Sequence, residues 1–397
     1  MQLATRLSVI QPSPTLALNA RAKALAAKGI DLANFAAGEP DFNVPAHIQD
    51  AIVAALKSGA TKYTATAGTP ELRAAISEAL LRDNALTFAP EQIIVTVGAK
   101  HALYSFFQAV LNPGDEVIVF SPFWPSYPEM VALAGGKPVV VTTREEDGFC
   151  PDAQSLRRAL TPKTRAIILN SPSNPTGAVT PQKTLVELAK TIADHSCLVV
   201  TDDIYEKLCY VDAPFQNILN AAPNLSGRVV VVNGWSKAYA MTGLRLGYAA
   251  GPKEIISAMQ LIQDQSTSNP TSIVQSGGVA ALKGPKAPIA EMVKEFRARR
   301  ELFVSGLNAI PGVRCRMPEG AFYVFPNVEG LLRKSYKGEP IGTSQRLSDI
   351  LVDDVRVVAM PGAPFGAEGY LRLSFATSRE VIQKGLDRLS AFAKSIG

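Results

Sequence analysis

The chain contains 397 residues, of which 47% are apolar and 19% are charged. This length exceeds what one ordinary hydrophobic core serves, and the apolar fraction is typical of folded proteins, so we expect two globular domains and exclude intrinsic disorder. The net charge of +5 is spread along the chain without long runs of one sign, which excludes a nucleic-acid-binding stripe and a polybasic membrane patch.

Signals for export, membrane insertion and metal binding are missing from the sequence. Residues 1–15 lack the pattern of a secretory signal, and no apolar stretch is long enough to span a bilayer. Three histidines far apart in sequence argue against a metal site, and four cysteines without C-x-x-C spacing are too sparse for a disulfide framework. We therefore expect a soluble cytoplasmic protein that binds no metal.

Short apolar runs rich in β-formers alternate with helical patterns in the first two thirds of the chain. Helices are predicted at residues 70–83 and 181–195, the latter with Thr180 as N-cap and Pro181 in its first turn. Such continuous apolar runs suit strands that are covered on both faces, and we predict strands at residues 93–97, 116–120, 138–141, 166–169, 198–201 and 229–232. This alternation predicts an α/β fold with a doubly wound, mainly parallel sheet.

The last third of the chain has a different pattern. Long helical stretches are separated by two strand-like segments, which indicates an α+β arrangement. The helices are predicted at 291–307, 344–351 and 379–395, and the strands at 320–325 and 370–375. We predict a large domain over residues 48–285 and a small α+β domain formed by residues 1–47 and 286–397.

The predicted strands are followed by unusual polar residues, and ligands of open α/β sheets bind beyond the carboxyl ends of the strands. Lys237 follows the run at 229–232 among apolar and aromatic residues, where desolvation would make its amine nucleophilic. The alternative is an ordinary lysine that extends to solvent. The surrounding segment partly matches a G-x-S-x-G nucleophile elbow, but Ala238 replaces the last glycine, so we reject a serine hydrolase.

Other polar groups allow a structural and a functional interpretation. Asp202 either caps a helix or faces a cationic ring nitrogen. The helix that opens at 98–100 offers free N–H groups to a phosphate, and 170–177 is a loop rich in turn-forming residues. Arg245 and Arg372 lie between apolar neighbours, and each forms either a structural ion pair or an anion clamp.

Taken in order, these segments resemble the class I aminotransferases, which are fold-type I enzymes dependent on pyridoxal 5′-phosphate (PLP), and are most similar to the bacterial aspartate aminotransferases. The resemblance covers nearly the whole chain. The matching segments are SPT at 13–15, AAGEPDF at 36–42, KYTATAGTPELR at 62–73, SPFWPSYPEM at 121–130, NSPSNPTG at 170–177, TDDIYE at 201–206, NGWSKAYAMTGLRLGY at 233–248 and LRLSFATS at 371–378.

The resemblance implies how the cofactor ring is held. Lys237 would form the internal Schiff base and, once released by an amino acid, act as general acid and base. Asp202 would pair with the pyridine nitrogen and keep it protonated. Asn174 and Tyr205 would hydrogen-bond the phenolic oxygen, and Trp124 would stack on the ring.

The resemblance also implies how the phosphate is held. Ala99 and Lys100 at a helix start, together with Ser236 and Arg245, would bind it within one subunit. Tyr63 would reach the phosphate of the neighbouring subunit. A homodimer with shared active sites follows from this arrangement.

For the substrate, the resemblance implies a bidentate clamp on the α-carboxylate by Arg372, aided by Asn174 and the backbone of Gly38, with Trp124 also in contact. The distal carboxylate would meet Lys100 and the hydroxyl groups near the N-terminus. The residues expected at that end are Lys100, Ser13 and Thr15, with Ser266, Thr267 or Ser268 from the other subunit.

The expected activity is that of an aspartate:2-oxoglutarate aminotransferase working by a ping-pong cycle. The alternative is an aromatic amino acid or prephenate aminotransferase of the same family, although Gln11 stands where prephenate-using relatives tend to have a basic residue. Asp203 and Leu244 also depart from the common pattern, which has Glu and Trp there.

Other classes of protein fit the sequence less well. A PLP-dependent β-lyase or ring-forming synthase would need the same Lys237 and Asp202, so the sequence separates it poorly from a transaminase. A PLP-sensing domain of a transcription factor is disfavoured because no helix-turn-helix pattern precedes residue 13. A Rossmann dehydrogenase is disfavoured because the chain has no G-x-G-x-x-G segment.

Overall fold

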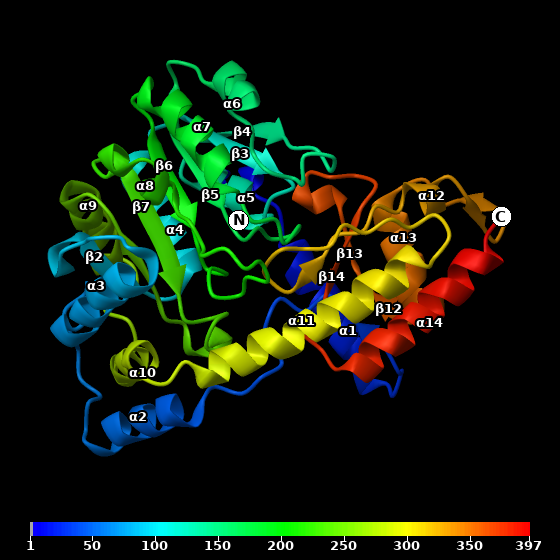
Figure 1. Cartoon of the computed structure of the whole chain (residues 1–397), viewed down its shortest axis with the longest axis horizontal. Coiled ribbons are helices and arrows are strands. Elements are labelled where there is room, and N and C mark those ends of the chain that lie inside the picture. The colour runs from blue at the N-terminus through cyan, green and yellow to red at the C-terminus, as the bar shows by residue number, and fades with distance from the viewer. Residues whose placement is uncertain (1–2) are drawn as a thin grey trace.

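A twisted seven-stranded sheet forms the centre of the larger part of the molecule (Figure 1). The computed structural model describes residues 3–397; residues 1 and 2, which belong to the predicted small domain, lie outside the described residues. The strand order is β2-β8-β7-β6-β5-β3-β4. The strands are β2 (Ile93–Thr96), β3 (Glu116–Ser121), β4 (Lys137–Thr142), β5 (Thr164–Asn170), β6 (Leu198–Asp202), β7 (Val229–Gly234) and β8 (Gly247–Ala250).

The prediction of a mainly parallel, doubly wound sheet is confirmed. Every predicted strand of this sheet is present, with ends that differ by at most two residues. The sequence prediction missed β8, which runs antiparallel to both β2 and β7. Its segment, GYAA, is too short and too rich in small residues to stand out as an apolar run.

Helices cover both faces of the sheet because successive strand residues point to opposite sides. In β6, Val199 packs into the core shared with α3 (Pro70–Asn84), α7 (Gln182–Ala193) and α10 (Ser272–Lys283). Its neighbour Val200 packs into the core on the other face. The helices of that face are α4 (Ala99–Val110), α5 (Ser126–Leu133) and α9 (Lys253–Asp264).

The two helices predicted in the large domain, α3 and α7, begin in different ways. The Thr69 hydroxyl accepts a hydrogen bond from the Leu72 N–H group, so α3 begins with a capped first turn and Pro70 at its first position. The prediction of Thr180 as N-cap of α7 is wrong. Pro181 occupies that position, because its ψ of 149° is extended and the helix begins only at Gln182.

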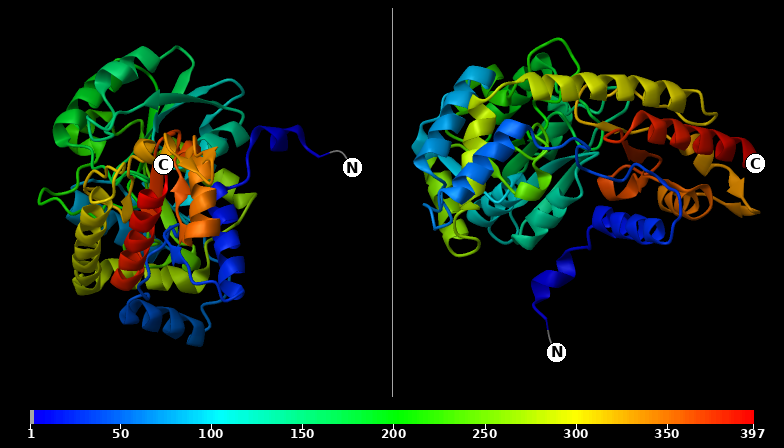
Figure 2. Two further views of the ribbon diagram at one scale, coloured as in Figure 1. Left: turned by 90° about the vertical axis from the view of Figure 1, so that its right-hand side faces the viewer. Right: turned by 90° about the horizontal axis from the view of Figure 1, so that it is seen from below.

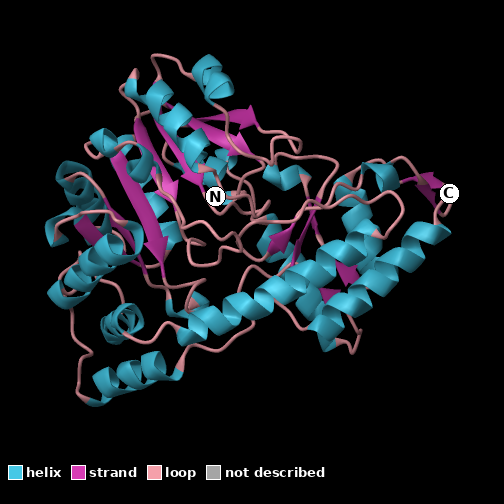
Figure 3. Cartoon of the chain, viewed as in Figure 1, coloured by secondary structure: helices cyan, strands magenta, loops and turns pink. Residues whose placement is uncertain are grey.

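A second core lies beside the sheet and combines both ends of the chain (Figure 3). The short strands β9 (Tyr323–Val324), β13 (Met360–Pro361) and β14 (Leu371–Ser374) form an antiparallel sheet, and β1 (Ala33–Asn34) pairs in parallel with β12 (Val357–Val358). The predicted strands at 320–325 and 370–375 are therefore present but shorter. Helices of this part are α1 (Pro14–Ala27), α11 (Ala287–Asn308), α12 (Glu329–Leu332), α13 (Ser344–Ile350) and α14 (Arg379–Ser395).

The remaining elements are peripheral. Helix α2 (Ala46–Lys57) packs against α10, and the described N-terminal residues before α1 form an arm that runs past α5 toward the outside of the molecule (Figure 2). The other short elements are α6 (Ala153–Ala159), α8 (Ile218–Ala221), β10 (Ser335–Tyr336) and β11 (Glu339–Pro340). Within residues 3–397, no helix has the length and hydropathy required to cross a membrane.

Candidate active site

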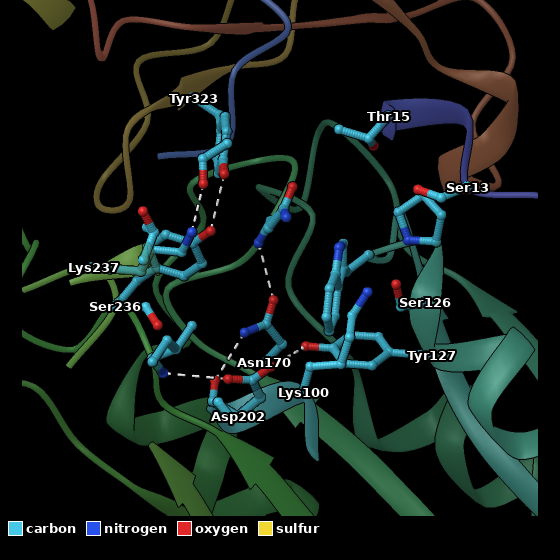
Figure 4. A pocket seen from close by; sticks show the side chains of 18 of the residues that line it. Ser13, Thr15, Lys100, Ser126, Tyr127, Asn170, Asp202, Ser236, Lys237 and Tyr323 are labelled. Atoms are coloured by element: carbon cyan, nitrogen blue, oxygen red, sulfur yellow. Dashed lines mark hydrogen bonds between the residues drawn. The ribbon is translucent and has the colours of Figure 1, made fainter. Parts of the chain in front are cut away.

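A cavity of about 290 Å³ lies at the carboxyl ends of β5, β6 and β7, beside β9 and β14 (Figure 4). All residues predicted for the site line this cavity except Tyr63 and residues 266–268, which were expected to act in the partner's site. Those that line it are Ser13, Thr15, Gly38, Ala99, Lys100, Trp124, Asn174, Asp202, Tyr205, Ser236, Lys237, Arg245 and Arg372.

Lys237 follows β7 and points into the cavity (Figure 4). Its ammonium group donates a hydrogen bond to the carbonyl oxygen of Gly38 and lies 5.7 Å from the centroid of the Phe322 ring. Desolvation lowers the pKa of this amine to about 8, opposed mainly by the nearby charge of Glu39. A substantial fraction of the amine is therefore neutral, and thus nucleophilic, near neutral pH.

Asp202 ends β6 and lies at the base of the cavity, nearly completely buried. The Tyr127 hydroxyl donates to its Oδ2 at 2.7 Å, and the Ile204 N–H group donates to its Oδ1 at 3.3 Å. Burial raises the pKa of this carboxyl to about 6, although the hydrogen bond from Tyr127 acts in the opposite direction. A buried carboxylate of this kind is suited to a cationic partner, such as a protonated ring nitrogen.

This raised pKa makes a testable difference to the stability of the cofactor-free protein. From about pH 4 to about pH 6 the folded state holds a proton on Asp202 that the unfolded state has lost, so stability falls as pH rises through this window. Above this window the buried charge of Asp202 lowers the stability of the folded state by about 3 kcal/mol. Asp202→Asn removes the charge, so the cofactor-free variant should be more stable than the native protein at about pH 8.

The measurement is denaturant unfolding of both cofactor-free proteins at about pH 4 and about pH 8. We expect the stability advantage of Asp202→Asn to shrink strongly at the lower pH, where the Asp202 carboxyl is protonated in the folded state. An advantage of the same size at both values would contradict a raised pKa at this residue.

A phosphate-sized recess lies where α4 begins. Gly98, with φ of 83°, immediately precedes the helix, and a Cβ atom there would lie 2.7 Å from a terminal nitrogen of Arg245. A Cβ atom on Gly247 would lie 2.4 Å from the backbone nitrogen of Ala99. The start of α4 can thus lie this close to Arg245 and to β8 only because residues 98 and 247 are glycines. Backbone N–H groups, the Ser236 hydroxyl and a guanidinium form a donor set that fits a phosphate dianion.

Arg372 occupies the opposite side of the cavity and is only 2% exposed. It donates to the Asn174 side-chain oxygen at 3.2 Å and to the Ala36 carbonyl at 3.0 Å, and its guanidinium lies 4.5 Å from the Tyr323 ring centroid and 5.1 Å from that of Phe365. Its Nε has no hydrogen-bond partner, and no carboxylate of the described chain pairs with it. A buried cation without a counter-ion indicates a site for an anion.

Lys100 lies across the cavity from Lys237 (Figure 4). Its ammonium group is 4.8 Å from the centroid of the Trp124 ring, and desolvation followed by the charge of Arg245 lowers its pKa. The side chains of Ser13 and Thr15, at the start of α1, line the same end. This end is therefore polar and positively charged.

Several predicted residues lie outside the cavity. The Tyr63 side chain is 91% exposed, and residues 266–268 do not line the cavity. Gln11 borders an adjacent groove, where its N–H group donates to Glu129 at 2.7 Å. Asp203 is buried, with its carboxylate accepting from Asn217 at 2.6 Å, and does not line the cavity. Leu244 likewise does not line the cavity; it packs against the core shared with α3, α7 and α10.

Eight residues that line the cavity were not predicted from the sequence, among them Tyr127, Asn170 and Tyr323. Tyr127 holds Asp202, and its position three residues after Trp124 at the start of a helix was the available signal. Asn170 pairs in register with Asp202 across β5 and β6 and donates to its carbonyl oxygen at 2.8 Å. The hydroxyl groups of Tyr323 and Tyr205 are hydrogen-bonded at 3.0 Å, a contact between distant segments that no local pattern indicates.

Comparison with known proteins agrees with this geometry. The family model "Aminotransferase class I and II" matches residues 30–389. An aspartate aminotransferase of Geobacillus stearothermophilus is 44% identical over 100% of both chains, and an aspartate/prephenate aminotransferase of Thermus thermophilus is 45% identical over 100% of this chain and 99% of its own. A crystal structure of an aspartate aminotransferase from Rhizobium meliloti superposes with a TM-score of 0.97 at 42% identity, covering 100% of both chains.

The chain therefore belongs to the class I and II aminotransferases. It is a PLP-dependent transaminase of fold-type I. When bound, PLP supplies an electron sink that stabilises negative charge on the carbon that bears the amino group.

Proposed function

We propose that the chain is an aspartate:2-oxoglutarate aminotransferase. The observation that carries this proposal is that two separate elements bring cations to the cavity, Arg372 from β14 and Lys100 from the start of α4. An amino acid with two carboxylates matches both, and Ser13 and Thr15 add hydroxyl donors beside Lys100. The names of the relatives support the same substrate, since they are aspartate or aspartate/prephenate aminotransferases.

In this proposal each group around the cofactor ring has one task. Lys237 holds the cofactor and then moves a proton at the substrate carbon, for which a pKa of about 8 is well matched. Asp202 stabilises the protonated ring nitrogen. Asn174 and Tyr205 donate to the phenolic oxygen, and Trp124 lies against the ring face.

The phosphate is assigned to Ala99, Lys100, Ser236 and Arg245, and in a homodimer to Tyr63 of the neighbouring copy. The exposure of the Tyr63 side chain supports a contact outside its own chain, and Tyr63 does not line the cavity of its own chain. The substrate α-carboxylate is assigned to Arg372, with Asn174 and the Gly38 backbone beside it, and Trp124 contacts the substrate as well. Residues 266–268 are assigned to the partner's cavity.

Loss of the Tyr63 hydroxyl should weaken cofactor binding in this homodimer. A hydrogen bond to a charged phosphate contributes about 1.5–3 kcal/mol, so Tyr63→Phe should raise the dissociation constant for PLP about tenfold or more. Fluorescence titration of the cofactor-free variant measures this constant, and sedimentation shows whether the dimer persists. An unchanged constant in an intact dimer would remove Tyr63 from the phosphate site.

The substrate assignment is tested by measuring kcat/KM for aspartate, phenylalanine and prephenate, each with a suitable acceptor or donor. We expect aspartate to be preferred over the aromatic substrate and prephenate. A higher value for phenylalanine or prephenate would overturn the assignment and favour the second candidate, an aromatic or prephenate aminotransferase. That candidate is supported by relatives named for both aspartate and prephenate, and Gln11 argues against it.

A different PLP reaction is tested in a separate assay with an amino acid that carries a leaving group on Cβ, such as cysteine. Pyruvate and ammonia formed without an added 2-oxo acid would indicate a β-lyase instead of a transaminase half-reaction. We expect neither product to accumulate.

We also propose that residues 48–285 form the large domain, that residues 1–47 and 286–397 form the small domain, and that the protein works in the cytoplasm. The separate apolar cores beside the large sheet and around α11 and α14 support the division. The four free cysteines are compatible with a reducing compartment.

A further inference from the structure

Residues 36–41 run beside the cavity and hydrogen-bond three of its lining residues. The Ala36 carbonyl accepts from Arg372, and the Gly38 carbonyl accepts from Lys237. The next residue, Glu39, is not part of the cavity lining, yet its carboxylate accepts a hydrogen bond from the Thr242 hydroxyl at 2.8 Å. The segment is thus hydrogen-bonded to Arg372, Lys237 and Thr242.

Thr242 connects this segment to the phosphate recess. It lines the cavity, and its carbonyl oxygen accepts from a terminal nitrogen of Arg245 at 2.9 Å. The segment from Ala240 to Arg245 is strained at both of its ends, since Ala240 and Arg245 have left-handed backbone conformations with φ of 53° and 54°. Non-glycine residues keep such conformations only where surrounding contacts hold them. The hydrogen bond to Glu39 is one of those contacts.

We propose that Glu39 is a positioning residue that forms a latch with Thr242, holding residues 36–41 over Lys237 and fixing the turn from which Arg245 reaches the phosphate. The proposal uses the PLP dependence of the family and is independent of which amino acid is the substrate.

The charge of Glu39 has a second effect that can be separated from its hydrogen bond. Desolvation dominates the pKa of Lys237, and Glu39 is the largest opposing influence. The other charged and titratable groups around Lys237 are Asp202, Arg245, Arg372 and Tyr205. A neutral residue at 39 that still accepts from Thr242 should therefore keep the latch and lose the charge effect.

Three substitutions separate the two effects. Thr242→Val removes the hydrogen bond and keeps the charge, Glu39→Gln keeps an acceptor and removes the charge, and Glu39→Ala removes both. The first readout is the dissociation constant for PLP, measured by fluorescence titration of the cofactor-free protein. The second is the pH midpoint of the visible absorbance of the bound cofactor. Glu187→Gln on the exposed side of α7 is the matched control.

We expect Thr242→Val and Glu39→Ala each to raise the dissociation constant about three- to tenfold, the equivalent of one hydrogen bond. The double variant Thr242→Val/Glu39→Ala should be no weaker than either single variant, because both remove the same contact. Thr242→Ser should restore binding. Glu39→Gln should move the pH midpoint lower by about half a unit, the order of magnitude for one charge acting across a solvated cavity.

Two results on the PLP dissociation constant would overturn the latch: an unchanged constant in Thr242→Val, or a constant in the double variant raised by the product of the two single effects. Failure of Thr242→Ser to restore the native constant would overturn it as well. So would a shift in the pH midpoint of the absorbance that is equal in Thr242→Val and Glu39→Gln. If Glu39→Ala does not fold, the Thr242 series and Glu39→Gln still decide the question. None of these readouts uses turnover of aspartate, so a wrong substrate assignment leaves them unaffected.

Discussion

Lys237→Ala should abolish the visible absorbance of bound cofactor and nearly all turnover. The amine of Lys237 lies between the Gly38 carbonyl and the rings of Tyr205 and Phe322. Desolvation lowers the pKa of this amine to about 8. Loss of proton transfer alone costs about 10²- to 10⁴-fold in rate, and loss of covalent attachment adds to that. Absorbance spectra of the purified variant incubated with PLP, and single-turnover measurements with aspartate, check the two parts separately.

The matched control is Lys253→Ala at the start of α9, which lies outside the cavity and should retain both absorbance and turnover. Retention of the absorbance band in Lys237→Ala would mean that another lysine carries the cofactor. Lys100 is the other lysine that lines the cavity, so it would be the first to replace.

Most strands of the large sheet could be predicted because both of their faces are buried; the exception is the edge strand β4, most of whose residues are half-buried or exposed. Strand β6 begins with three apolar residues and β7 with four, and their polar residues come only near the end, so the signal is a continuous run. Strand β8 could not be found in this way. Its glycine and alanines are selected by close contact, since a Cβ atom at Gly247 would collide with the start of α4.

Lys237 and Asp202 could be placed at the cavity from the sequence because they come after predicted parallel strands, whose carboxyl ends meet at one edge. Contacts that complete the site depend on tertiary structure instead. Tyr323 meets Tyr205, and Ala36 meets Arg372, across more than a hundred residues of chain. Neither periodicity nor local spacing contains that information.

Substitution of Arg372 should change activity and stability in opposite directions. The guanidinium of Arg372 is buried without an acidic partner. The desolvation of this charge therefore lowers the stability of the folded protein, and little offsets the effect until an anion binds. Arg372→Met keeps an apolar side chain of similar length and removes the charge. The cofactor-free variant should therefore be at least as stable to denaturant as the native protein.

Activity should respond in the opposite direction. Removing one partner of a buried charge pair costs about 2–5 kcal/mol, so Arg372→Met should lower kcat/KM roughly 30- to 4000-fold. The loss should be similar for aspartate and for phenylalanine, since both present an α-carboxylate. Arg372→Lys keeps the positive charge but cannot form a bidentate pair with a carboxylate, so its kcat/KM should lie between those of the native protein and Arg372→Met. A loss confined to dicarboxylates would place Arg372 at the distal end of the substrate, and a marked loss of stability would make it a structural residue.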